Sequence, residues 1–203
     1  QLRNFQQVTK EEDGVNPSPV EGSDFIDGVF FMNQDAMSIN SADVEFEFEP
    51  GDAHVDGSWS GIYSNFTHQF SDGVRFIEVA GMRGIETGVG MHAAVGMTFD
   101  LAAIRETHGN SAVEFFSTFA GRDGWAGGCK ASIRLYVIYS NENEILDEAW
   151  TWRGVKGEGA CHVSVIPRDA TFLTIANGSD DNELCCDHGV FAHARIYPEP
   201  ILE

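Results

Sequence analysis

The sequence predicts an all-β protein, a sandwich of two antiparallel β-sheets with one or two short helices. Its 203 residues include 22 Gly and 15 Phe, a composition that favours strands and tight turns. Short apolar or alternating runs recur along the chain, separated by Gly, Asn and Asp, which is typical of β-sandwiches. A chain of this length can bury a full core as one domain.

The first 23 residues show no hydrophobic periodicity and contain Pro17 and Pro19. We expect them to form an N-terminal arm or linker that takes any order from a partner or from the domain surface. Residues 24–203 are expected to form the sandwich domain.

The segment 44–49 alternates without exception between apolar residues and glutamates. In a strand this pattern places three apolar side chains on one face and three carboxylates on the other. Aligned like charges resist edge-to-edge pairing, so we expect this strand at the margin of a sheet. Further strands are expected at 25–31, 62–70, 74–80, 97–101, 113–119, 133–139, 161–165, 171–176 and 190–197. Two segments, 101–108 and 142–152, are expected to be helical for two or three turns.

The charge of the chain excludes some partners. Its formal net charge is −20, and no Lys or Arg lies between Lys10 and Arg75. Such a surface repels nucleic acid and anionic membranes. No apolar run approaches the roughly 20 residues of a spanning helix, so membrane insertion is not expected. Most carboxylates are expected to serve solubility in a saline or cation-rich setting, while a few could hold one structural calcium ion.

The four cysteines indicate an exported protein, secreted or at the cell surface. They are Cys129, Cys161, Cys185 and Cys186, an even number that fits disulfides outside the cytosol. A bond between the adjacent Cys185 and Cys186 would close a strained ring, so we expect one of them to pair with Cys129 or Cys161. Zinc binding is the competing interpretation, but no CxxC pair is present. The chain begins with Gln, which we interpret as a processed or trimmed start.

Two motifs about a hundred residues apart carry a family resemblance. The first is the segment 88–93 (GVGMHA), followed by 99–101 (FDL), and the second is Asp187-His188 at the opening of the last strand. Together they resemble the NPCBM family of carbohydrate-binding modules over residues 58–198. The resemblance implies a galactose-binding-like jelly roll that binds a glycan without catalysing a reaction.

We expect the two motifs to meet because two stacked antiparallel sheets bring them together. His92 and His188 would then hydrogen-bond to sugar hydroxyls or hold a loop that does so. The alternative is a structural role, in which both are buried and pair with Asp187 or with a carbonyl group.

The segment 121–128 (GRDGWAGG) is the best candidate for a ligand-binding loop. Its glycines would let Trp125 project beside Arg122 and Asp123, so that a sugar ring stacks on the indole. Trp59 is a second candidate. Trp150 and Trp152 are two residues apart and would share one face of a strand. Core packing is the alternative for every Trp.

The sequence therefore predicts a non-catalytic carbohydrate-binding module whose ligand contacts are Trp125, Arg122, Asp123, His92, Asp187 and His188. No nucleophile motif such as GxSxG occurs, and the acids are too numerous to single out a glycosidase pair, so no enzymatic activity is expected. One alternative is a structural subunit of an extracellular filament or surface layer, in which the N-terminal arm adds a strand to a second copy. Another is a sandwich appended to a larger enzyme.

Overall fold

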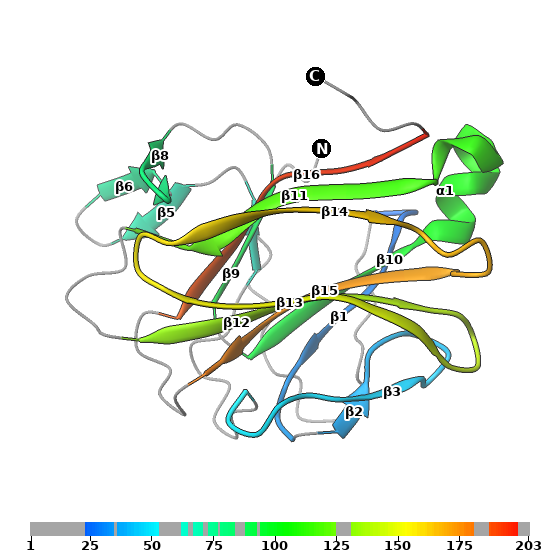
Figure 1. Cartoon of the computed structure of the whole chain (residues 1–203), viewed down its shortest axis with the longest axis horizontal. Helices are drawn as coiled ribbons and strands as arrows, with labels where there is room; N and C mark the ends of the chain where they lie inside the picture. Colours follow the sequence, from blue (N-terminus) through cyan, green and yellow to red (C-terminus); the bar gives the residue numbers. More distant parts are fainter. Residues whose placement is uncertain are drawn as a thin grey trace.

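The fold is that of a computed structural model, described here over residues 23–34, 36–52, 62–64, 67–70, 73–76, 78–83, 88–92, 94–124, 131–180 and 187–198. Two five-stranded antiparallel sheets dominate it (Figure 1). The first sheet contains, in spatial order, β1 (Ile26–Phe31), β10 (Val95–Asp100), β15 (Phe172–Ser179), β12 (Ser132–Ser140) and β13 (Ile145–Val155). The second sheet contains β14 (Gly159–Val165), β11 (Phe115–Arg122), β16 (His188–Tyr197), β9 (Gly88–His92) and β4 (Ile62–Ser64). This arrangement confirms the predicted two-sheet sandwich.

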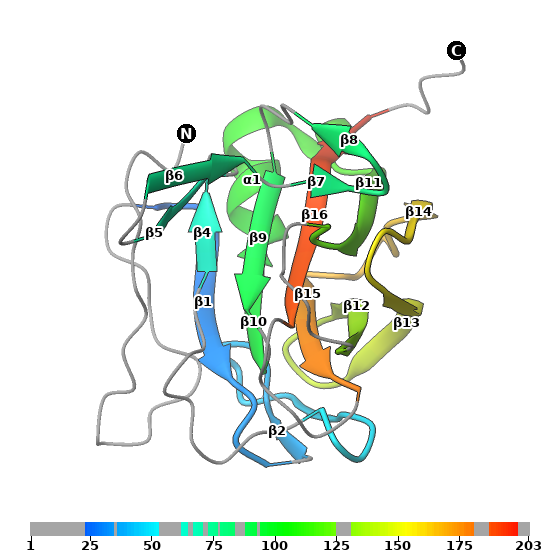
Figure 2. The same ribbon diagram turned by 90° about the vertical axis from the view of Figure 1, so that its left-hand side faces the viewer.

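Three small hairpins and one α-helix complete the described structure. The hairpins pair β2 (Ala36–Ser38) with β3 (Glu45–Glu47), β5 (Thr67–Phe70) with β6 (Gly73–Phe76), and β7 (Glu78–Val79) with β8 (Met82–Arg83). The helix α1 (Leu101–His108) follows β10 directly, and the 3₁₀ turn η1 (Asn110–Ala112) leads from it into β11. The helix lies at one end of the sandwich, to the right of the long strands in Figure 1 and behind the strands in Figure 2. Within the described ranges, no helix has the length and apolar character needed to cross a membrane.

The main core lies between the two sheets. Inward residues of the first sheet, among them Leu135, Val137 and Ile175, pack against Phe116 and Phe191 of the second sheet. A second core lies on the outer face of the first sheet. There Phe46 and Phe48 of the β3 segment pack against Tyr136, with ring centroids 5.8 and 5.2 Å away. The alternation predicted for 44–49 is confirmed, because its apolar side chains are buried and its glutamates exposed.

Residues 145–152 belong to strand β13, and the expected helix over 142–152 does not form. A turn at residues 141–144 precedes the strand, and there the side chain of Asn141 accepts hydrogen bonds from the backbone N–H groups of Asn143 and Glu144. The turn lets β13 run antiparallel to β12. Trp150 and Trp152 share one face, as expected for a strand, and stack with centroids 6.4 Å apart. The composition of the segment favours a helix, but pairing with β12 outweighs this preference. The pairing supplies hydrogen bonds to the backbone and buries part of both indole rings.

Most other predicted strands keep their places with small shifts, but 62–70 is divided between β4 and β5, and 74–80 between β6 and β7. The helix over 101–108 is confirmed, while β9 is a strand over the GVGMHA motif, where no strand was predicted. The N-terminal arm lies outside the described residues except for residue 23.

Candidate functional site

The structure brings His92 and His188 together. β9 and β16 are antiparallel neighbours, and His92 lies directly opposite His188. The two rings are 4.4 Å apart between centroids and nearly perpendicular, at 84°. The two sequence motifs therefore meet as expected, but within one sheet and not through the stacking of two. His92 is buried and His188 is half-buried.

Arg122 and Asp123 lie beside these histidines and are also buried. Arg122 is the last residue of β11 and lies opposite Gly189, and both Arg122 and Asp123 have 0% exposed surface. The backbone N–H of Asp123 donates to the carbonyl of His188 at 2.8 Å, and its Oδ1 accepts from the N–H of Glu78 at 3.1 Å. The sequence predicted an exposed loop here. The strand instead continues through Arg122, and a bridge from Asp123 to Val79 covers its end.

Asn177 joins the two sheets at this point. Its Nδ2 donates to the carbonyl oxygens of Met91 at 2.9 Å and Asp187 at 2.8 Å, so β15 of the first sheet is tied to β9 and β16 of the second. A Cβ atom on Gly189 would lie 2.7 Å from Asn177, which explains the absence of a side chain there. Sequence reasoning missed Asn177. The available signal was a polar residue at an inward position of β15, after Leu173 and Ile175.

We name this region the histidine end, defined by His92, Arg122, Asp123, Asp187 and His188. Five of the six predicted ligand contacts thus come together, four of them buried and His188 half-buried. Burial agrees with the structural alternative for the histidine pair, and direct contact of these five residues with a ligand stays a prediction. The sixth residue, Trp125, and the second candidate, Trp59, lie outside the described residues.

A second buried polar cluster lies nearby on the outer face of the first sheet. Asp52 is fully buried and accepts hydrogen bonds from Arg134 Nη1 at 3.0 Å and from the Tyr136 hydroxyl. The other terminal nitrogen of Arg134 reaches Asp180 Oδ1 at 2.5 Å, and Asp180 also accepts from Arg153 and from the Ser132 hydroxyl. These contacts fasten the end of the β3 segment, which carries Asp52, onto the sheet.

Burial dominates the titration of two groups in this cluster, Asp52 and Tyr136. It raises the pKa of Asp52 to about 6, because removing the carboxylate from water costs more than the bonds from Tyr136 and Arg134 return. Burial likewise raises the pKa of Tyr136, so its hydroxyl remains a donor. Burial alone would raise the pKa of Asp180, but the hydrogen bonds from Arg153 and Ser132 outweigh it, so the pKa is lowered.

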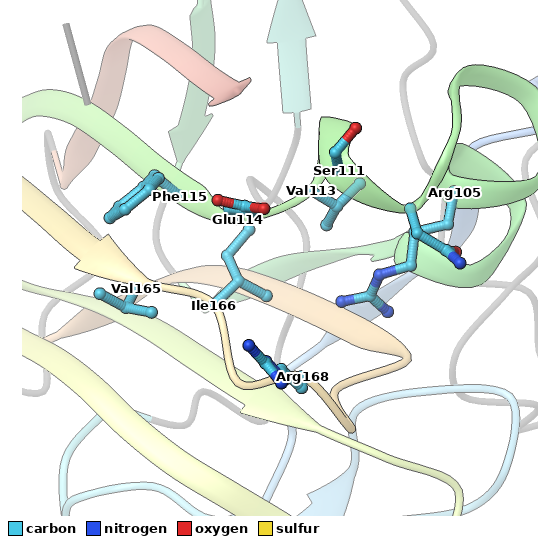
Figure 3. A pocket seen from close by; sticks show the side chains of 9 residues that line it. Arg105, Ser111, Val113, Glu114, Phe115, Val165, Ile166 and Arg168 are labelled. Carbon is cyan, nitrogen blue, oxygen red and sulfur yellow. The ribbon is translucent and has the colours of Figure 1, made fainter. Parts of the chain in front are cut away.

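A pocket of about 560 Å³ lies at the opposite end of the sandwich (Figure 3). We name it the helix-end pocket. It is lined by residues of α1, η1, the start of β11 and the segment that follows β14: Arg105, Asn110, Ser111, Val113, Glu114, Phe115, Val165, Ile166 and Arg168. The pocket and the histidine end lie at opposite ends of β11. Phe115, the first residue of this strand, lines the pocket, and Arg122, the last, belongs to the histidine end.

The apolar part of the helix-end pocket is rigidly held. Val113 and Ile166 are buried, and the N–H of Ile166 donates to the carbonyl of Glu114 at 2.8 Å. Phe115 is half-buried and stacks on Tyr197, with centroids 5.9 Å apart and planes inclined by 19°. The ring of Phe115 is therefore fixed at the pocket wall.

The polar part of the pocket offers both donors and acceptors. Arg105 and Arg168 bring guanidinium groups, Glu114 a carboxylate, and Asn110 and Ser111 an amide and a hydroxyl. Sequence reasoning nominated none of these residues. Each is ordinary in its local sequence, and only the packing of four separate elements brings them together.

The described residues test one of the four cysteines and part of the metal prediction. Cys161 is an exposed free cysteine on β14, so of the two partners considered for Cys185 or Cys186 it is the one that the structure does not support. Odd-numbered residues of this strand point outward to solvent, and Cys161 is one of them. Cys129, Cys185 and Cys186 lie outside the described residues, so their pairing stays a prediction. Over the described ranges, no group of three or more His, Cys, Asp or Glu could hold a metal ion, and calcium stays a prediction.

The chain matches no protein-family model and no curated protein. It is similar to three solved structures that contain CBM51 modules, each at a TM-score of 0.47. One is a CBM51 from Clostridium perfringens GH95 in complex with methyl-galactose, at 19% identity over 68% of this chain and 89% of that one. Another holds the CBM51-2 and INT domains of Clostridium perfringens ZmpB, at 15% identity over 69% of this chain and 28% of that one. The third holds the tandem CBM51 modules of Sp3GH98, the family 98 glycoside hydrolase from Streptococcus pneumoniae SP3-BS71, at 14% identity over 70% of this chain and 42% of that one.

Proposed function

We propose that this chain is a non-catalytic glycan-binding module of a secreted or cell-surface protein, and that the helix-end pocket receives the sugar. One observation carries the proposal: Phe115, stacked on Tyr197, lines one pocket together with two guanidinium groups, a carboxylate and an amide. A sugar ring presents C–H groups on its faces and hydroxyl groups at its rim. It therefore needs an aromatic surface and surrounding hydrogen-bonding groups, and the pocket supplies both.

The size of the pocket agrees with a small part of a glycan. Its volume of about 560 Å³ lies within the roughly 300–1,000 Å³ of small-molecule sites. With one aromatic residue and a few polar groups, a single pocket should bind weakly. Strength would then come from several modules or from attachment to an enzyme.

The acidic groups at the pocket support binding without hydrolysis. Glycoside hydrolysis ordinarily uses two carboxyl groups about 5–10 Å apart. Among the described residues that line the pocket, Glu114 alone carries a carboxylate.

The test is a glycan array, followed by titration of the best ligand into the Phe115→Ala variant. We expect about a tenfold loss of affinity, equivalent to about 1.4 kcal/mol, because the aromatic surface is removed. Phe119→Ala is the matched control, since Phe119 lies on the same strand outside the pocket lining and should leave affinity unchanged. Thermal unfolding of both variants checks that they remain folded.

The experiment tests the proposed function and the proposed position of the binding site separately. An array without any bound glycan would overturn the proposed function. Affinity lost in Trp125→Ala but kept in Phe115→Ala would move the binding site to the region that the sequence predicted and overturn its placement in the helix-end pocket.

A further inference from the structure

The helix-end pocket has a charge opposite to that of the chain as a whole. The protein has 12 Lys plus Arg against 32 Asp plus Glu. The pocket lining nevertheless contains two arginines and one glutamate, a local charge of +1. A locally positive hollow in a protein of net charge −20 is the place where an anionic group meets the least repulsion.

Arg105 is positioned before any ligand arrives. It extends from α1, is half-buried, and donates from Nη1 to the carbonyl of Ala170 at 2.5 Å. A guanidinium group has five N–H donors in a fixed plane, and this bond uses one of them. The remaining donors are therefore held at the pocket without the entropy cost of ordering a free side chain.

Arg168 faces the same pocket from the segment that follows β14. Its side chain is exposed, and it forms no ion pair with any acidic group in the described part of the chain. Figure 3 shows both guanidinium groups on one side of the pocket, with the Glu114 carboxylate on the other side. The two positive charges are thus not neutralised by the single carboxylate of the lining.

We infer that the helix-end pocket prefers a sugar that bears an acidic group, a carboxylate or a sulfate, bound between Arg105 and Arg168. The inference rests on the proposed glycan-binding function and names the class of sugar. Both acidic groups present oxygen atoms that accept two parallel N–H bonds from a guanidinium group, the strongest kind of polar contact available to this pocket. The apolar face of the same sugar would lie against Phe115.

The test compares matched sugars by titration calorimetry or by chemical-shift titration. Methyl glucuronide is compared with methyl glucoside, and methyl galactoside 6-sulfate with methyl galactoside. We expect at least one acidic sugar to bind about tenfold more tightly than its neutral partner. The pair with the larger ratio identifies carboxylate or sulfate as the preferred group.

Arg168→Gln is the decisive variant, because its exposed side chain contributes little to folding. It should reduce the ratio of acidic to neutral affinity severalfold, because Arg105 alone then faces the acidic group. Arg195→Gln makes the same change in net charge outside the pocket lining and should keep the ratio. Glu114→Gln should raise the affinity for the acidic sugar, since it removes the one opposing charge.

Equal affinity for acidic and neutral sugars, unaltered by Arg168→Gln, would overturn this inference and leave the proposed function standing. An Arg195→Gln variant that loses the preference as fully as Arg168→Gln would also overturn it, because the effect would then be long-range. Binding of no sugar at all would overturn the proposed function itself.

Discussion

Asp52 is the residue at which burial and charge oppose each other most directly. Its carboxyl group has no exposed surface and lies 3.0 Å from the guanidinium group of Arg134. A buried ion pair stabilises the fold only where the attraction between its charges exceeds the cost of removing them from water. For Asp52 that cost is the larger effect, because its pKa is raised above the ordinary value. The protonated carboxyl group is therefore favoured in the folded protein. Stability from this group is fully present below pH 3.8 and is lost as the pH rises through about 6.

We expect the Asp52→Asn variant to remove this pH dependence. The free energy of unfolding of the natural protein, minus that of the variant, should fall by about 2 kcal/mol between pH 4 and pH 7. Urea unfolding at a series of pH values measures this difference. Asp147→Asn, at an exposed position on β13, makes the same change in net charge away from Asp52 and serves as the control. A difference that rises with pH would show that the pairing with Arg134 outweighs burial.

At the scale of elements, α1 closes one end of the core and forms part of the helix-end pocket. It begins after Asp100, whose Oδ1 accepts a hydrogen bond from the N–H of Ala103 at 2.8 Å. Leu101 is fully buried in the main core, so the helix is held by one cap and one apolar anchor at its start. Arg105, one turn later, owes its place at the pocket to this anchoring.

Asp100→Ala should therefore weaken both the helix and the pocket. We expect a loss of about 1 kcal/mol in the free energy of unfolding, because the first turn loses its side-chain acceptor. Glu106→Ala, at an exposed position of the same helix, should change stability by less than about 0.5 kcal/mol. Chemical denaturation of the two variants side by side tests the cap, and an equal effect in both would contradict it.

For the whole molecule, the dominant electrostatic feature is an excess of negative charge. At a net charge of −20, repulsion among surface carboxylates acts against the compact state. Salt screens this repulsion, since the Debye length falls from about 10 Å at 0.1 M to about 3 Å at 1 M.

We expect the melting temperature at pH 7 to rise when NaCl is increased from 0.1 to 1 M. The control is the same titration at pH 4.5, near the isoelectric point, where repulsion is small and the rise should largely disappear. Differential scanning calorimetry measures both. An equal rise at the two pH values would assign the effect to salting-out and not to charge repulsion.

The sequence by itself determined the class of the fold, most strand positions and the helix over 101–108. These features follow from local patterns: the two-residue period of 44–49 needs no knowledge of the partner strand to place its apolar residues on one face. The meeting of His92 and His188 was also predicted, but not the way in which they meet, because the two strands that carry them are neighbours in one sheet. The strand over 145–155 was not predicted, since the composition of that segment favours a helix. Its pairing with β12 outweighs that preference.

Only the tertiary structure decided which polar residues are buried and which surround a pocket. Arg122 and Asp123 have the composition of an exposed loop, yet the covering segment at Val79 encloses them. Arg105, Phe115 and Arg168 carry no shared sequence signal, and they meet because α1, β11 and the exit of β14 pack at one end of the sandwich. Burial and pocket formation depend on contacts between segments that are distant along the chain, and a local pattern cannot encode them.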